Sequence, residues 1–216
     1  INTDYIKVIK DKYTAQAYIT TDKSSNQITT FHPGAMQHAN EIKIPDNGSI
    51  TLGIISPDGR DGMIEHTQQL IDMKVPYVFD PGQGMPMFNK EELVFFSDNA
   101  SWVVMNDYEF KMYNEITGYT PADVIQNNKT LVITNGDQGS NIFTENKKLN
   151  IATPKVDNPK DPTGCGDAYR AGIMYGIMNN MPLEKIGELS SALGALKAKS
   201  YGTQNHIIGT EIKKLL

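Results

Sequence analysis

The chain has a single cysteine and only two arginines, and both scarcities limit what it can be. Cys165 alone cannot form an intramolecular disulfide, which favours a reducing compartment and predicts a cytoplasmic protein. Any guanidinium contact that this chain makes to a phosphate must come from Arg60 or Arg170. The sequence contains no run of about 18 apolar residues, so no membrane span is predicted. No charged-then-apolar signal segment opens the chain, and its start at Ile1 rather than Met predicts a processed or cut N-terminus.

Positive charge is also in short supply. The chain has 25 acidic and 20 basic residues, which gives a formal net charge of −5. Nucleic-acid binding needs a basic surface, so no nucleic-acid partner is expected. A small phosphate ligand is still compatible with this charge, because backbone N–H groups can hold it. The chain lacks a Walker A pattern and a G-x-G-x-x-G that opens a helix after an early strand, which disfavours a P-loop protein and a Rossmann domain.

A short β-rich segment precedes the rest of the fold. Residues 14–20 and 27–31 form two β-rich runs, and a polar turn separates them at residues 22–26. This pattern predicts a β-hairpin with one buried face and one polar face. The segment holds too little apolar surface to fold alone, so we expect it to pack against another part of the protein.

From Ser49 onward, short apolar runs alternate with segments of helical spacing. The predicted strands cover residues 50–56, 75–79, 102–105 and 131–134, with a hairpin at 141–152. The predicted helices cover residues 59–73, 90–97, 108–116, 121–126, 166–178 and 182–200. This order indicates an α/β fold with a doubly wound, mostly parallel sheet and helices on both faces. Such sheets bind ligands at the carboxyl ends of their strands.

The strongest chemical pattern is Asp161-Pro162-Thr163-Gly164-Cys165-Gly166-Asp167, at the start of a predicted helix. Glycines on both sides of Cys165 would leave backbone N–H groups pointing outward at the positive end of the helix dipole. Gly164, Cys165 and Gly166 are therefore predicted to cradle the charge of a phosphoryl group in transfer. Asp167 could accept a proton from an attacking hydroxyl. A glycine-rich loop followed by an ordinary first-turn acid is the plainer interpretation.

These seven residues resemble the D-T-x-G-A-G-D signature of the ribokinase (PfkB) family of carbohydrate and nucleoside kinases. The chain departs from it at Pro162 and Cys165, two positions that shape the backbone, so the cradle is expected to survive. A helix N-terminus lowers a thiol pKa, which would suit a nucleophile. No histidine partner lies near Cys165 in the sequence, however, so a space-filling role is predicted for it.

The segment Asn106-Asp107-Tyr108-Glu109 matches the N-x-x-E motif of that family. A spacing of three places Asn106 and Glu109 on one face of a starting helix. By resemblance, this pair organises Mg²⁺, through water, and the phosphates of ATP. A helix cap followed by a solvated Glu is the alternative interpretation.

Two further segments are similar to the nucleotide site of the family. Thr134-Asn135-Gly136-Asp137-Gln138-Gly139 resembles its T-x-G-x-x-G loop, which implies ATP contacts at Thr134, Asn135, Gly136 and Gly139. The Ala-rich segment 190–199 and the following Gly202-Thr203-Gln204 resemble the part that lines the adenine site. The family also often binds a monovalent cation nearby, and Asp161, Thr163 and Gly202 would be its counterparts here, with K⁺ as the expected ion.

The resemblance extends from residue 14 to Gln204 and implies an enzyme. The implied reaction is ATP-dependent phosphoryl transfer to a primary hydroxyl of a nucleoside or sugar. The segments 31–36 and 79–83 look most like a bacterial adenosine-kinase-like branch. A sugar kinase of the ribokinase or fructokinase type, and a non-catalytic nucleotide-binding fragment, are the alternatives.

The resemblance also predicts the domain organisation. Residues 1–216 would form one incomplete kinase domain, with a lid segment at 13–38 and an α/β nucleotide-binding core at 45–216. The family normally begins with a strand and a Gly-Gly-Asn region that binds the sugar, so most residues that select the acceptor are expected outside this chain. A homodimer formed through the lid is a further expectation.

Overall fold

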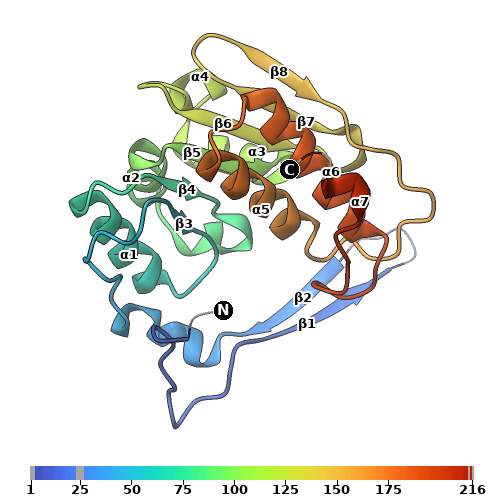
Figure 1. Ribbon diagram of the computed structural model, residues 1–216. Helices are drawn as coiled ribbons and strands as arrows, with labels where there is room; N and C mark the ends of the chain where they lie inside the picture. Colours follow the sequence, from blue (N-terminus) through green and yellow to red (C-terminus); the bar gives the residue numbers. More distant parts are fainter. Residues whose placement is uncertain (1–2, 23–26, 214, 216) are drawn as a thin grey trace. The chain divides into compact units, whose positions relative to one another are not determined.

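The computed structural model describes residues 3–22, 27–213 and 215. The chain divides into two compact units, Ile1–Ala100 and Ser101–Leu216, each with its own strands and helices (Figure 1). Neither described unit contains a helix with the length and apolar character that a bilayer crossing requires.

The first unit begins with the predicted hairpin. Strand β1 (Gln16–Thr21) pairs antiparallel with β2 (Gln27–His32), and Tyr18 lies opposite Thr30. The expectation of one buried face is wrong, because every side chain of β1 is exposed. The register explains this outcome: Tyr18 and Ile28 lie on one face while Ile19 and Phe31 lie on the other, so neither face is uniformly apolar. Residues 23–26 of the predicted turn lie outside the described residues.

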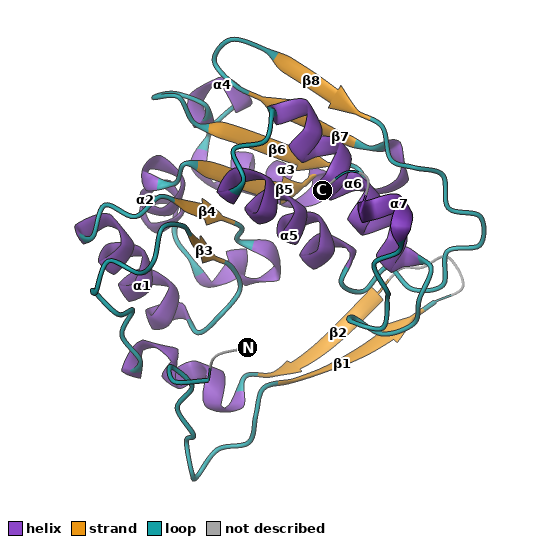
Figure 2. Ribbon diagram, in the orientation of Figure 1, coloured by secondary structure: helices purple, strands orange, loops and turns teal. Residues whose placement is uncertain are grey.

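The remainder of the first unit alternates strands and helices (Figure 2). Its elements are, in order, η1 (Gly34–Glu41), β3 (Gly53–Ile55), α1 (Arg60–Asp72), β4 (Tyr77–Phe79), η2 (Gly82–Met87) and α2 (Lys90–Asn99). Strands β3 and β4 are parallel. The two 3₁₀ segments, η1 and η2, occupy stretches that carried no predicted element. The core includes Phe79 stacked on Phe96 at 5.0 Å and Phe88 edge-on to Phe96 at 4.9 Å between ring centroids.

The second unit holds the segments that carry the chemical motifs. Its elements are β5 (Trp102–Asn106), α3 (Asp107–Thr117), α4 (Pro121–Val124), β6 (Thr130–Thr134), η3 (Gly136–Gln138), β7 (Ser140–Phe143), β8 (Lys148–Ile151), α5 (Cys165–Met178), α6 (Leu183–Ala198) and α7 (Thr210–Lys213). Strands β5 and β6 are parallel, whereas β7 and β8 continue the sheet antiparallel. In Figure 1, α5 and α6 lie in front of these strands and α3 lies behind them.

Helices α5 and α6 pack closely because small residues meet at their contact. A Cβ atom added at Gly172 of α5 would lie 2.6 Å from Cα of Ser190 on α6, so any larger side chain must push the helices apart. Leu189 and Leu193 of α6 are buried in the same region, together with Ala168 of α5. This packing fixes the start of α5, where the Asp161–Asp167 motif ends.

Replacing Gly172 by Val should therefore lower the thermal stability. Overpacking of a tight contact costs about 1–3 kcal/mol, which corresponds to roughly 2–12 °C in Tm for a chain of this size. Ala171→Val is the matched control, because Ala171 is the exposed neighbour of Gly172 on α5. It places the same valine in α5 without the contact to α6. Helix propensity alone would favour Gly172→Val over Ala171→Val, because Val is a better helix former than Gly and a poorer one than Ala. Equal melting temperatures for the two variants would contradict the close packing.

Candidate active site

The N-x-x-E segment forms a capping box at the start of α3. The Asn106 side chain accepts a hydrogen bond from the Glu109 backbone N–H at 2.7 Å. The Glu109 carboxylate accepts one in return from the Asn106 backbone N–H, also at 2.7 Å. The helix cap of the alternative interpretation is therefore present. It orients the side chains of Asn106 and Glu109 at the end of β5.

Exposure of the asparagine distinguishes this cap from a second one in the same chain, because Asn106 is half-buried and Asn89 is exposed. Asn89 and Glu92 make the same pair of hydrogen bonds at the start of α2, at 2.9 and 3.0 Å. Glu109 is half-buried, so the solvated Glu of the plainer interpretation is not found at α3. Burial raises the pKa of its carboxyl above the usual value. The charge of Arg170 lowers that pKa and so offsets part of the effect of burial. A half-buried carboxyl group held next to a guanidinium is a candidate functional acid.

The parallel pairing of β5 and β6 brings two motifs together. Asn106, the last residue of β5, lies opposite Thr134, the last residue of β6. The N-x-x-E helix and the T-x-G-x-x-G loop therefore start side by side at the carboxyl ends of neighbouring strands, where α/β sheets bind ligands. Within the loop, the Asn135 N–H donates to the Gly139 carbonyl at 2.8 Å, and the Thr153 hydroxyl donates to the Gly136 carbonyl at 3.0 Å.

The Asp161–Asp167 segment turns sharply into helix α5. Gly164 is the N-cap residue with φ +88°, a left-handed conformation that favours glycine. A Cβ atom there would lie 3.0 Å from the Thr203 carbonyl oxygen. Gly166 and Asp167 lie in the first turn of α5, where backbone N–H groups have no carbonyl partner within the helix and can bind an anion. The Cys165 N–H already donates to the Pro162 carbonyl at 3.0 Å, so the geometry is compatible with the predicted cradle chiefly at Gly166.

Cys165 is the first residue of α5 and is half-buried. Burial raises the pKa of its thiol, which opposes formation of a thiolate at neutral pH. The sulfur lies 4.0 Å from the Asp161 carbonyl oxygen. This environment favours the space-filling role over a nucleophile.

Asp167 projects from the first turn of α5 and pairs with Arg170 one turn later. The Asp167 side chain is 72% exposed, and its Oδ1 accepts a hydrogen bond from Arg170 Nη2 at 2.5 Å. A carboxylate has a second oxygen, so this ion pair still permits Asp167 to accept a proton. Arg170 therefore lies close to both the candidate base and Glu109. The sequence identified Arg170 as a potential phosphate contact, and its i, i+3 spacing from Asp167 allows this ion pair. It gave no sign that Arg170 lies near Glu109.

Asp161 ties the anion-binding segment to the chain that follows α6. Its carboxylate accepts hydrogen bonds from the backbone N–H groups of Thr163 at 2.9 Å and Gly202 at 2.8 Å. Hydrogen bonding from Thr163 is the main cause that lowers the pKa of Asp161, so the carboxylate remains charged over the physiological range. The structure thus brings together Asp161, Thr163 and Gly202, the three residues expected around a monovalent cation.

The sequence did not identify two further polar residues of this region. Tyr169 of α5 is buried, and its hydroxyl lies 2.8 Å from Ser140 Oγ at the start of β7, which ties the helix to the strand after the nucleotide loop. Lys197 of α6 is fully buried. A lysine inside an Ala-rich helix was the available signal for the second residue, although its burial cannot be deduced from the local sequence.

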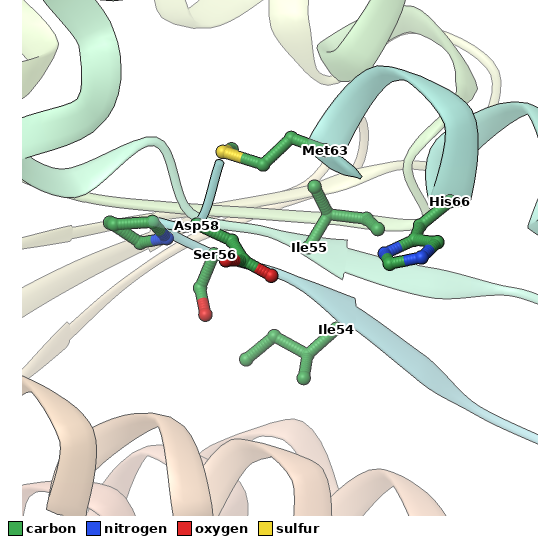
Figure 3. A pocket seen from close by; sticks show the side chains of 7 residues that line it. Ile54, Ile55, Ser56, Asp58, Met63 and His66 are labelled. Atoms are coloured by element: carbon green, nitrogen blue, oxygen red, sulfur yellow. The ribbon is translucent and has the colours of Figure 1, made fainter. Parts of the chain in front are cut away.

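The first unit contains a separate small pocket of about 160 Å³ at the end of β3 (Figure 3). It is lined by residues 54–58, Met63 and His66. Burial raises the pKa of Asp58 in this pocket. Small-molecule sites commonly span roughly 300–1,000 Å³, so this pocket alone is too small to enclose a nucleoside.

Comparison with known proteins identifies the family. The model of the pfkB family of carbohydrate kinases matches residues 1–209. The chain belongs to this family. The prediction of a kinase, made from the Asp161–Asp167, N-x-x-E and T-x-G-x-x-G patterns, is thereby confirmed at the level of the family.

Relatives and solved structures agree with this assignment. A nucleoside kinase of Methanocaldococcus jannaschii is 30% identical, and the match covers 96% of this chain and 68% of that protein. The structure of a Burkholderia thailandensis nucleoside kinase in complex with inosine is 39% identical with a TM-score of 0.93, and covers 95% of this chain and 68% of that one. A ribokinase of Thermotoga maritima, at 19% identity and a TM-score of 0.74, shares the fold. The predicted fold class is confirmed: a mixed, mostly parallel sheet with helices, plus a separate two-stranded antiparallel sheet.

The two capping boxes allow a matched test of the candidate site. Asn106→Ala and Asn89→Ala should each lower the free energy of unfolding by about 1 kcal/mol, the usual loss for an N-cap residue. Kinase activity should separate them, since Asn106→Ala should also reduce turnover by roughly 10- to 100-fold, as for residues that orient a metal site. Denaturant unfolding and steady-state kinetics measure the two effects. An equal loss of activity in both variants would show that Asn106 is a cap and no more.

Proposed function

We propose that this kinase transfers the γ-phosphoryl group of ATP to a primary hydroxyl of a nucleoside. The observation that carries the proposal is the likeness, over nearly the whole chain, to a nucleoside kinase whose structure contains inosine. A second structure of that protein is described as a complex with ADP-inosine, and it matches all of this chain at 38% identity. The adenosine-kinase-like branch remains a prediction within this broader class.

In this proposal, different residues of the second unit bind ATP, bind the phosphoryl group and accept the proton. Asp167 accepts the proton of the attacking hydroxyl, while the backbone of Gly164, Cys165 and Gly166 binds the phosphoryl group as its charge develops. The loop from Thr134 to Gly139, with Asn135 and Gly136, and the segment at Gly202 bind ATP. The pairing of Asn106 with Thr134 supports this arrangement, because it places two of these segments at one edge of the sheet.

The same proposal includes Mg²⁺ near Asn106 and Glu109. Within the described residues, no group of three or more His, Cys, Asp or Glu side chains could hold a metal ion directly. Mg²⁺ fits such a site, since it retains several waters and usually binds one or two carboxylates together with substrate phosphates. The half-buried Glu109 carboxyl suits this role, because a nearby cation favours its ionised form. Bound there, the ion would neutralise negative charge on the phosphates.

Several earlier expectations stay predictions. They are the lid at residues 13–38, the nucleotide-binding core at 45–216, the homodimer through the lid and the cytoplasmic location. The exposed Tyr18 and Ile28 of the hairpin, 63% and 77% exposed, offer apolar surface that a partner or a substrate could cover.

An acceptor screen tests the nucleoside assignment. ADP formation should be measured with purified protein, ATP and MgCl₂, in the presence of inosine, adenosine, ribose or fructose. We expect nucleosides to be phosphorylated with kcat/KM at least about 10-fold above the sugars, since a site that hydrogen-bonds a base loses those contacts with a free sugar. Omission of MgCl₂ should abolish the reaction. Preferred turnover of fructose or ribose would instead establish a sugar kinase.

Asp167→Asn tests the base. Turnover should fall by about 10²- to 10⁴-fold, the usual contribution of a positioned general base, while the KM for ATP changes little because the backbone cradle is retained. Asp61→Asn is the matched control: Asp61 is also an exposed first-turn acid, and it pairs with Arg60 at 3.2 Å. Near-normal turnover of Asp167→Asn would mean that Asp167 is an ordinary first-turn acid. Joint collapse of turnover and ATP binding would assign it to holding the loop.

A further inference from the structure

Lys197 is the one lysine among the described residues with no measurable solvent exposure. It lies in the last turn of α6, where the helix dipole favours a positive charge. Lysine is almost never fully buried unless its charge is compensated, because an ammonium ion loses several kcal/mol of hydration on leaving water. Its burial therefore calls for partners that replace the lost water.

Those partners are backbone carbonyl oxygens at the start of the anion-binding segment and after α6. Lys197 Nζ donates to the Asp161 carbonyl at 2.8 Å and to the Ser200 carbonyl at 3.1 Å. The charge of Lys197 also contributes to lowering the pKa of the Asp161 carboxyl. The ammonium group thus lies between carbonyl oxygens, with a carboxylate nearby to balance its charge.

Asp161, one of the two residues that Lys197 contacts, was also expected to bind a monovalent cation. Asp161, Thr163 and Gly202 are the counterparts of its ligand residues, yet both Asp161 carboxylate oxygens already accept backbone N–H groups and its carbonyl accepts Lys197. Carbonyl oxygens that receive an ammonium proton at hydrogen-bond distance are poorly available to K⁺. The residues present therefore fit an internal ammonium group better than a free monovalent ion.

We propose that the Lys197 ammonium group serves as a built-in cation that holds the anion-binding segment 161–167 against the end of α6, so that the kinase needs no added monovalent cation. The Ala198 carbonyl continues the same attachment, since it accepts the N–H groups of Lys160 at 2.7 Å and Asp161 at 3.4 Å. Lys197 is a positioning residue here, acting on the phosphoryl group through the segment that it fixes. The inference rests on the proposed kinase function of this site.

The experiment compares the cation dependence of three proteins. ADP formation is measured in KCl and in choline chloride at equal ionic strength, for the natural protein, Lys197→Met and Lys199→Met. Lys199 is the control because it lies two residues further along the same helix end and is exposed. The natural protein and Lys199→Met should turn over equally in both salts. Lys197→Met should lose roughly 10- to 100-fold in choline chloride, as expected for loss of a supporting group, and should recover activity with KCl or methylammonium chloride.

Two further measurements keep the proposal falsifiable. Lys197→Gln retains hydrogen-bond donors without the charge, so full turnover of that variant in choline chloride would overturn the role of the charge. Thermal melting reports on the site without catalysis: K⁺ should raise the Tm of Lys197→Met above its value in choline chloride, and should leave the natural protein unchanged. Strong K⁺ activation of the natural protein would overturn the proposal. Absence of phosphorylation with any acceptor would instead refute the proposed function, while the melting experiment still tests Lys197.

Discussion

The parallel hydrogen bonding between β5 and β6 is the constraint on which the candidate site depends. Their register pairs Asn106 with Thr134, so the N-x-x-E segment and the T-x-G-x-x-G loop start at the same edge of the sheet, although α3, α4 and β6 separate them in sequence. A slip of one residue would turn every side chain of a strand to the opposite face. The pairs Val104–Val132 and Val103–Leu131 lie on opposite faces of the sheet, and the burial of all four side chains holds this register.

The anion-binding segment has a different kind of support. In sequence it lies between β8 and α5, and it includes the first turn of α5. Polar contacts from Asp161 hold it: its carboxylate binds two backbone N–H groups, and its carbonyl binds the buried Lys197. Charged hydrogen bonds are stronger than neutral ones in such a setting. The segment can therefore keep a fixed shape while leaving the N–H groups at the start of α5 open to a ligand.

A sequence motif and its function separate clearly in this chain. Asn89-x-x-Glu92 and Asn106-x-x-Glu109 form the same capping box, and each glutamate has an arginine nearby, Arg60 for Glu92 and Arg170 for Glu109. The local pattern predicts the cap in both places. What makes the second pair a candidate for metal and phosphate chemistry is its position at the end of β5, where Asn106 lies opposite Thr134 at the start of the T-x-G-x-x-G loop.

The sequence by itself determined the order of strands and helices and the three motifs, because apolar periodicity and helix-start signals are local. The sequence also predicted that α5 begins at Gly166, and the structure places its first residue at Cys165, one residue earlier. Only the tertiary structure decided that Lys197 is buried against Asp161, and that Arg170, which pairs with Asp167 one turn earlier, also lies near Glu109. These features depend on helix packing, which joins residues that are distant in sequence, so no local pattern encodes them.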